Sequence, residues 1–245
     1  MPRVARNRGA VWLFRSASLK LRDRLPDLAD IKQIENATDD AAKKVAYEKL
    51  VDEMLASPEF SKTMIKFWQD TFRTDSGAAR FAAQLVVADR SYAELFTATD
   101  NTCPTYDGAT NTFTAAKCAQ TGPIAGVLTD PGILGQYFAN MAFRRVRFVQ
   151  ETFACNKFPA EFSDDPQPMG NGVYTAKIPF NSITGKETKP DAKVDFQDTK
   201  AVVCANCHAN MKRLSPLFRN YDAKGALQGA PQVKVPMQGE PAAAR

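Results

Sequence analysis

The chain has 245 residues, 44% of them hydrophobic, and a formal net charge of +5 at neutral pH. This length suits one large domain or two small ones, and this apolar content is enough for a buried core. Because the longest apolar stretches, such as Phe81–Ala88, fall far short of the roughly 20 residues that cross a bilayer, the sequence predicts no membrane-spanning helix.

Positive charge is concentrated at the start of the chain. Residues 1–24 hold seven basic residues and one acidic residue, 7 − 1 = +6, so the rest of the chain sums to 5 − 6 = −1. Such an arm can contact an acidic partner or a membrane surface, and we expect no nucleic acid. A solvated, partly disordered tail is the simpler interpretation. Helical spacing in Val11–Leu25, closed by Pro26, predicts that residues 1–25 form a basic arm and a first helix.

Capping residues and apolar spacing predict a helical domain over residues 26–156. Ser57 is a typical N-cap, and Pro58 fits the first helical position. The predicted helices are Leu28–Asn36, a helix capped by Thr38-Asp39-Asp40 that runs to Leu55, a helix from Pro58, Ala78–Asp89 and Ser91–Ala98. A further helix start is indicated by Thr129-Asp130-Pro131.

Two of these helices carry apolar residues at helical spacing. Aromatic residues at this spacing can wall a cofactor pocket, but they more often belong to an ordinary core, which we expect here. The first set is Val45, Leu50, Val51, Met54 and Leu55, and the second is Phe60, Met64, Phe67, Trp68 and Phe72.

Three of the five cysteines suggest an oxidising compartment. Cys103 and Cys118 bracket a polar stretch in which Asp107-Gly108 is a turn signal, so we predict a disulfide across a hairpin-like loop. Cys155 is then left over, and a buried thiol is its expected state.

The composition changes after residue 156. Lys157–Lys200 is rich in Pro, Gly, Asp, Ser and Lys, which predicts loops and a short strand pair around Val173–Phe180. A loop of this length is uncommon unless it is functional, and here it can wrap a cofactor. We therefore predict a loop-rich region over residues 157–245, packed as one unit with the helical domain.

Within this region, Cys204, Cys207 and His208 stand in the order that attaches a c-type haem. In that chemistry the two thiols add to the haem vinyl groups, and the adjacent imidazole binds the iron from the proximal side. A redox Cys-x-x-Cys pair lacks its usual strand–helix setting here, and a zinc site lacks a standard fourth ligand. We expect one covalent haem c, with those two sites and a chance match of the three-residue motif as the alternatives.

The sixth iron position is open to several ligands. His208 is the only histidine, so bis-histidine ligation within the chain is impossible. Met211 follows His208 by three residues and on a helix projects from the same proximal side. Met237, after a proline in the C-terminal segment, is the first candidate, and Met169 is the second.

The segment Gln136–Phe153 is amphipathic with a cationic side. Arg144 and Arg145 on that side can bind haem propionates through their guanidinium groups, or they can simply face solvent. Together these features predict a mostly α, irregular helical domain with long loops and a C-terminal c-type haem-binding segment.

Several segments in chain order resemble the planctomycete-type cytochrome c proteins, which are large secreted bacterial proteins. The segments are Ser16–Ile31, Tyr47–Arg73, Asp89–Asp100, Gly126–Leu134, Arg144–Pro159 and Cys204–Gly225. The resemblance implies a compact relative with a single haem motif. Val146 stands where the family has glycine, and Arg213–Pro216 departs from the family's Asp-Pro-Leu-Gly, so the longer relatives' enzymatic roles are not implied.

From these observations we expect an exported protein with one haem that transfers single electrons, to or from a redox protein or within a larger complex. Its expected location is periplasmic or extracellular, with membrane association through partners, although Ala10–Phe14 is too short for the apolar core of a signal peptide. Two alternatives remain. One is an accessory subunit of a membrane-associated complex, and the other is a peroxidase-like haem enzyme with an open sixth iron position.

Overall fold

The computed structural model describes residues 3–120, 122–139, 142–156, 167–169, 172–174, 211 and 214–229, with side chains from residue 11 onward except at 167–174. These residues are mostly helical, as predicted. The chain divides into two compact units: Met1–Cys118 with Ile124–Val127 (unit 1), and Ala119–Pro123 with Leu128–Arg245 (unit 2). This contact-based division differs from the predicted boundaries at residues 25 and 156. The predicted haem-binding region 157–245 stays a prediction, because most of it lies outside the described residues.

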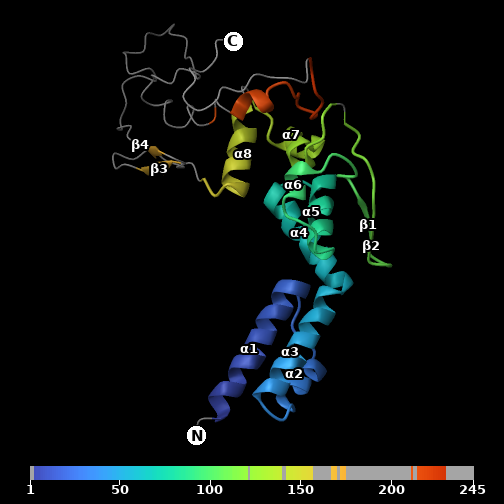
Figure 1. The fold of residues 1–245 in the computed structure, drawn as a ribbon, viewed down its shortest axis with the longest axis vertical. Coiled ribbons are helices and arrows are strands. Elements are labelled where there is room, and N and C mark those ends of the chain that lie inside the picture. Colours follow the sequence, from blue (N-terminus) through green and yellow to red (C-terminus); the bar gives the residue numbers. More distant parts are fainter. Residues whose placement is uncertain are drawn as a thin grey trace. The chain divides into compact units, whose positions relative to one another are not determined.

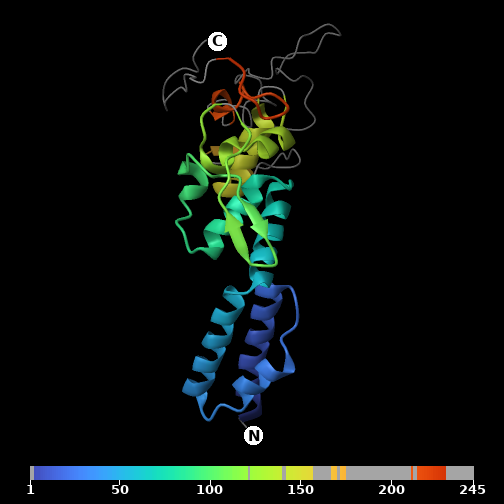
Figure 2. The ribbon, with the colours of Figure 1, turned by 90° about the vertical axis from the view of Figure 1, so that its right-hand side faces the viewer.

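Unit 1 begins with three helices that lie side by side (Figures 1 and 2). They are α1 (Arg3–Arg22), α2 (Leu28–Glu35) and α3 (Asp40–Leu55). The expectation of a disordered basic tail was wrong for residues 3–10, which belong to α1. The helix ends at Arg22 because Asp23 adopts a left-handed backbone, with φ of 53°.

A small core joins these three helices. Phe14, Ile34, Leu50 and Met54 are buried there. The rings of Phe14 and Tyr47 pack in a T-shaped arrangement with 6.2 Å between their centroids. Asp39 caps α3, as predicted, by accepting a hydrogen bond from the backbone N–H of Ala42 at 2.8 Å. Of the five residues predicted to be core, Val51 is half-buried and two are exposed: Val45 is 66% exposed and Leu55 is 39% exposed.

The next helices of unit 1 are α4 (Pro58–Phe72), α5 (Gly77–Val87) and the short α6 (Glu94–Thr97). Ser57 caps α4 by accepting from the N–H of Phe60 at 3.3 Å, with Pro58 in the first turn as predicted. Phe60, Trp68 and Phe72 are buried, which confirms the prediction of ordinary core for these positions. Phe67 is 52% exposed and is the exception in the stripe.

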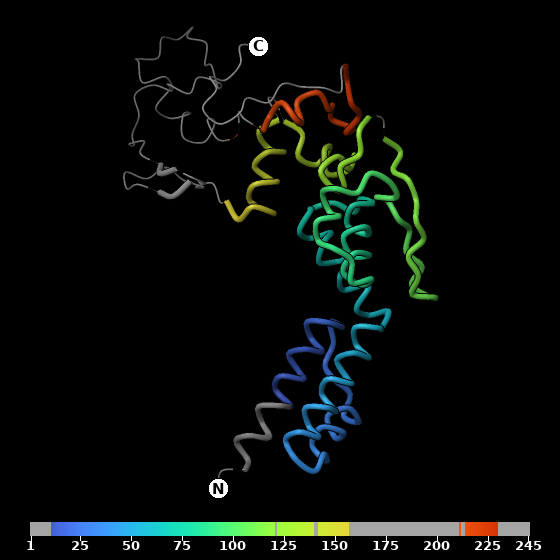
Figure 3. Tube along the Cα trace, viewed as in Figure 1, coloured from blue at the N-terminus to red at the C-terminus, as the bar shows by residue number. Residues whose placement is uncertain are grey.

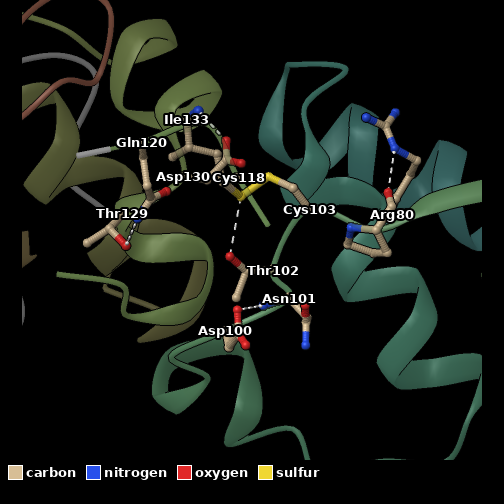
Figure 4. The surroundings of a disulfide bond; sticks show 11 residues. Arg80, Asp100, Asn101, Thr102, Cys103, Cys118, Gln120, Thr129, Asp130 and Ile133 are labelled. Atoms are coloured by element: carbon tan, nitrogen blue, oxygen red, sulfur yellow. Dashed lines mark hydrogen bonds between the residues drawn. A yellow bond between two sulfur atoms is a disulfide. The ribbon is translucent and has the colours of Figure 1, made fainter. Parts of the chain in front are cut away.

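A disulfide-closed hairpin completes unit 1. Strands β1 (Thr105–Asp107) and β2 (Thr112–Thr114) pair antiparallel, and the predicted bond between Cys103 and Cys118 closes the hairpin (Figure 4). The Thr102 hydroxyl lies 3.3 Å from Cys118 Sγ and donates to it, because a disulfide sulfur carries no hydrogen. Arg80 Nε donates to the Pro104 carbonyl at 3.1 Å, which fixes the start of β1.

Unit 2 contains α7 (Pro131–Gln136), α8 (Phe143–Phe153), the short strands β3 (Gln167–Met169) and β4 (Gly172–Tyr174), and the 3-10 helix η3 (Ser215–Leu217). A 3-10 helix, η1 (Gly126–Thr129), precedes α7. Asp130 caps α7 by accepting from the N–H of Ile133 at 2.9 Å. The predicted amphipathic segment is interrupted, because α7 ends at Gln136 and Ala142 takes a left-handed backbone before α8. Cys155 is exposed, so the prediction of a buried thiol was wrong.

No helix among the described residues is both long enough and apolar enough to cross a membrane. In Figure 3 the tube of residues 214–229 passes beside the first turn of α8, where the best-defined core of unit 2 lies.

Candidate functional site

The predicted haem-attachment residues Cys204, Cys207 and His208 lie outside the described residues, as does Met237. The structure describes only the backbone of Met169, at the end of β3. The described residues that come next after the motif in the chain belong to the core of unit 2.

Met211 is the first described residue after the haem motif, and it is 7% exposed. It packs in a cluster formed by Leu134, Ala142, Val146, Phe218 and Tyr221. Met211 follows His208 by three residues in the sequence, and its side chain is packed in this core.

Arg145, on α8, is the largest of the fully buried side chains among the described residues, with 2% of its surface exposed. Its Nε donates to the Leu134 carbonyl at 2.8 Å. One terminal nitrogen donates to the backbone carbonyls of Phe218 at 2.8 Å and Tyr221 at 2.6 Å. The other terminal nitrogen donates to the backbone carbonyl of Asp222 at 2.6 Å. One guanidinium thus ties α7 and α8 to a segment more than seventy residues further along the chain.

Opposing effects act on the charged form of Arg145. Burial lowers the pKa of this guanidinium from its usual value, and the nearby Asp222 carboxylate acts in the opposite direction. The face of the Phe138 ring lies 5.3 Å from the guanidinium carbon, which adds a cation–π contact. These contacts use four of the five guanidinium N–H groups, and the burial of Arg145 shows that the alternative of a solvated residue was wrong. Binding of a haem propionate by Arg145 stays a prediction.

The loop that Arg145 holds is built around Asp222. Its Oδ1 accepts from the backbone N–H groups of Lys224 at 2.8 Å and Ala226 at 2.9 Å, and these bonds hold the pKa of Asp222 below its usual range. Gly225 has φ of +75°, and a Cβ there would lie 2.5 Å from Pro131 Cα. The segment Tyr221–Gly225 is therefore a structural turn that needs glycine at the third position after Asp222.

Arg144, the neighbouring arginine, is exposed on α8. Its only described hydrogen bond is a long one, 3.4 Å, to the Phe138 carbonyl. Of the two predicted propionate ligands, it is the exposed one.

Sequence reasoning missed the anchoring role of Arg145. The signal lay in a helical neighbour, because Val149 stands four residues after it, on the same face of α8. Val149 packs against the unit 2 core. An arginine at this spacing from a core residue lies toward the buried side of the helix.

Comparison with known proteins locates one similarity. Residues 5–123 match the model of a family described as PSCyt2, protein of unknown function (DUF1549). The matched segment covers nearly all of unit 1 and ends before α7. No curated protein and no solved structure matches the chain.

Proposed function

We propose that the protein is an exported c-type cytochrome with one haem, held by Cys204 and Cys207 and ligated by His208, and that it transfers single electrons. The observation that carries the proposal is the spacing of these three residues, which suits two vinyl additions and one proximal ligand. Bound in this way, the haem supplies reversible one-electron chemistry, while the protein holds it in place.

Three features of the chain support the proposal. The disulfide Cys103–Cys118 suits an oxidising compartment, where this type of haem is attached. The resemblance to planctomycete-type cytochrome c proteins agrees with the similarity of residues 5–123 to the PSCyt2 family. The core around Met211 and Arg145 is held by buried packing and hydrogen bonds and adjoins the motif in the chain, which suits a fixed cofactor position.

The test is an absorption spectrum of the protein from its native host, with a pyridine haemochrome assay for covalent haem c. The variant Cys204→Ala should lose covalent haem. The matched control is Cys155→Ala, which removes the exposed free thiol and should leave haem content unchanged. A protein without haem c, with zinc in its place or with a redox-active Cys204–Cys207 pair, would refute the proposal.

The sixth ligand separates electron transfer from catalysis. We expect a methionine-to-iron absorption band near the red end of the spectrum, lost in Met237→Ala and retained in Met169→Ala. Loss of the band in Met169→Ala alone would assign the sixth ligand to Met169 and not to Met237. A high-spin spectrum that shifts on adding cyanide or carbon monoxide would mean an open iron, and the haem-enzyme alternative would replace electron transfer.

A further inference from the structure

Helix α1 presents an uncovered apolar face to solvent. Phe14 and Ser18 are fully buried against the neighbouring helices, while Trp12 is 65% exposed, Leu13 55% and Leu19 43%. Elsewhere in the described chain exposed apolar side chains are mostly scattered, but here three lie within eight residues of one helix. A tryptophan with two leucines on a solvent face points to a surface that is covered in use.

The arrangement of charge around these side chains is specific. At 3.6 residues per turn, Trp12 and Leu19 lie within about 20° of each other around the helix axis. Arg15 lies about 40° to 60° from these two residues on one side, and on the other side Lys20 lies about 80° to 100° and Leu13 about 100° to 120° from them. The buried residue Phe14 lies on the opposite side of the helix.

The two flanking cations are free of partners. Arg15 and Lys20 are exposed, and neither forms an ion pair with any described residue. The helix Arg3–Arg22 contains six basic residues and no acidic residue in its sequence. In contrast, Lys44 and Lys49 of α3 are each paired with a glutamate one turn away.

We propose that this face of α1, with Trp12 and Leu19 at its centre and Arg15 and Lys20 at its edges, docks on an anionic lipid surface. Tryptophan and leucine suit the boundary between headgroups and acyl chains, and long basic side chains extend from there to the phosphates. A helix that lies in the interface needs no membrane-spanning length, which agrees with the lengths and compositions of the described helices. The proposal is independent of haem binding and goes beyond the proposed electron transfer.

The test uses the full-length protein with two kinds of vesicle, phosphatidylcholine alone and phosphatidylcholine mixed with phosphatidylglycerol. Binding is measured by co-flotation, and insertion is measured by tryptophan emission. We expect flotation with the anionic vesicles only, with a blue shift of emission that is absent in Trp12→Phe. That variant isolates Trp12, because the chain has two tryptophans and Trp68 is buried.

Charge is tested with two matched double variants. Each basic residue near an anionic surface contributes about fivefold, so Arg15→Ala with Lys20→Ala should weaken binding about thirtyfold. The control, Lys44→Ala with Lys49→Ala, removes the same formal charge and should change binding far less. Far-UV circular dichroism checks that each variant folds.

Three results would overturn the proposal. The first is no flotation with anionic vesicles, and the second is an equal loss in both double variants. The third is flotation without a shift of Trp12 emission combined with equal binding to a soluble acidic polypeptide, which would assign the face to an acidic protein partner instead.

Discussion

Replacing Arg145 with methionine should destabilise unit 2 and loosen the turn that follows Tyr221. Methionine keeps much of the apolar stem but removes every donor, so four backbone carbonyls lose a charged partner. Two of these carbonyls, those of Phe218 and Asp222, also accept a backbone N–H and stay satisfied. The carbonyls of Leu134 and Tyr221 have no other donor among the described hydrogen bonds outside helices.

The magnitude follows from these two carbonyls. A buried acceptor that loses its only donor costs about 1 to 3 kcal/mol, so two of them cost about 2 to 6 kcal/mol. The variant also avoids burying a guanidinium, a cost that is visible in the lowered pKa of Arg145. The net loss of unfolding free energy should therefore be about 3 kcal/mol. The loss for Arg145→Lys should lie between zero and the loss for Arg145→Met, because an ammonium group cannot reproduce the planar fork of the guanidinium.

The assay is urea unfolding followed by far-UV circular dichroism, with hydrogen exchange to localise the effect. In Arg145→Met the amides of Asp222, Ala226 and Gln228, which bond within the turn, should exchange faster than in the parent protein. The matched control is Arg144→Met, which removes an exposed arginine one position away and should cost less than about 0.5 kcal/mol. Equal losses in the two variants would refute the anchoring role of Arg145.

Three further predictions concern single features. Gly225→Ala should cost more than about 1 kcal/mol, because φ is +75° and the new Cβ meets Pro131; the urea midpoint measures it. Reducing Cys103–Cys118, which are 15 residues apart, should cost about 3 kcal/mol in the same assay. The pKa of Asp222 is depressed by backbone N–H groups, so its contribution is complete above an ordinary aspartate pKa of about 3.9 and is lost as pH falls through the lower folded value. Urea midpoints between about pH 5 and pH 2 should therefore fall less in Asp222→Asn than in the parent.

Each of these predictions has a result that contradicts it. A Gly225→Ala protein as stable as the parent would mean that the turn relaxes away from α7 without cost. Unchanged stability after reduction would mean that the hairpin is held by its other contacts alone. The same acid dependence in Asp222→Asn and the parent would assign the effect to other carboxylates.

Local signals in the sequence predicted the helix starts and the hairpin. Asp39, Ser57 and Asp130 each cap a helix as expected, because a cap needs only a side-chain oxygen and a backbone N–H three residues ahead. The disulfide could be predicted from the sequence in the same way, because its two cysteines bracket one short turn. The haem motif is a covalent pattern and is complete in the sequence, although it lies outside the described residues.

Only the tertiary structure decided which face of each helix is buried. Phe67 and Val45 occupy positions in apolar patterns but stay exposed, because no helix of the described part of the chain covers them. Arg145 stands in a cationic run but is buried, because carbonyls up to 77 residues further along the chain accept its hydrogen bonds. The physical reason is the separation in sequence between the interacting groups. A helix cap is satisfied within one turn of the chain, whereas the burial of a side chain depends on partners that the fold brings from distant parts of the sequence.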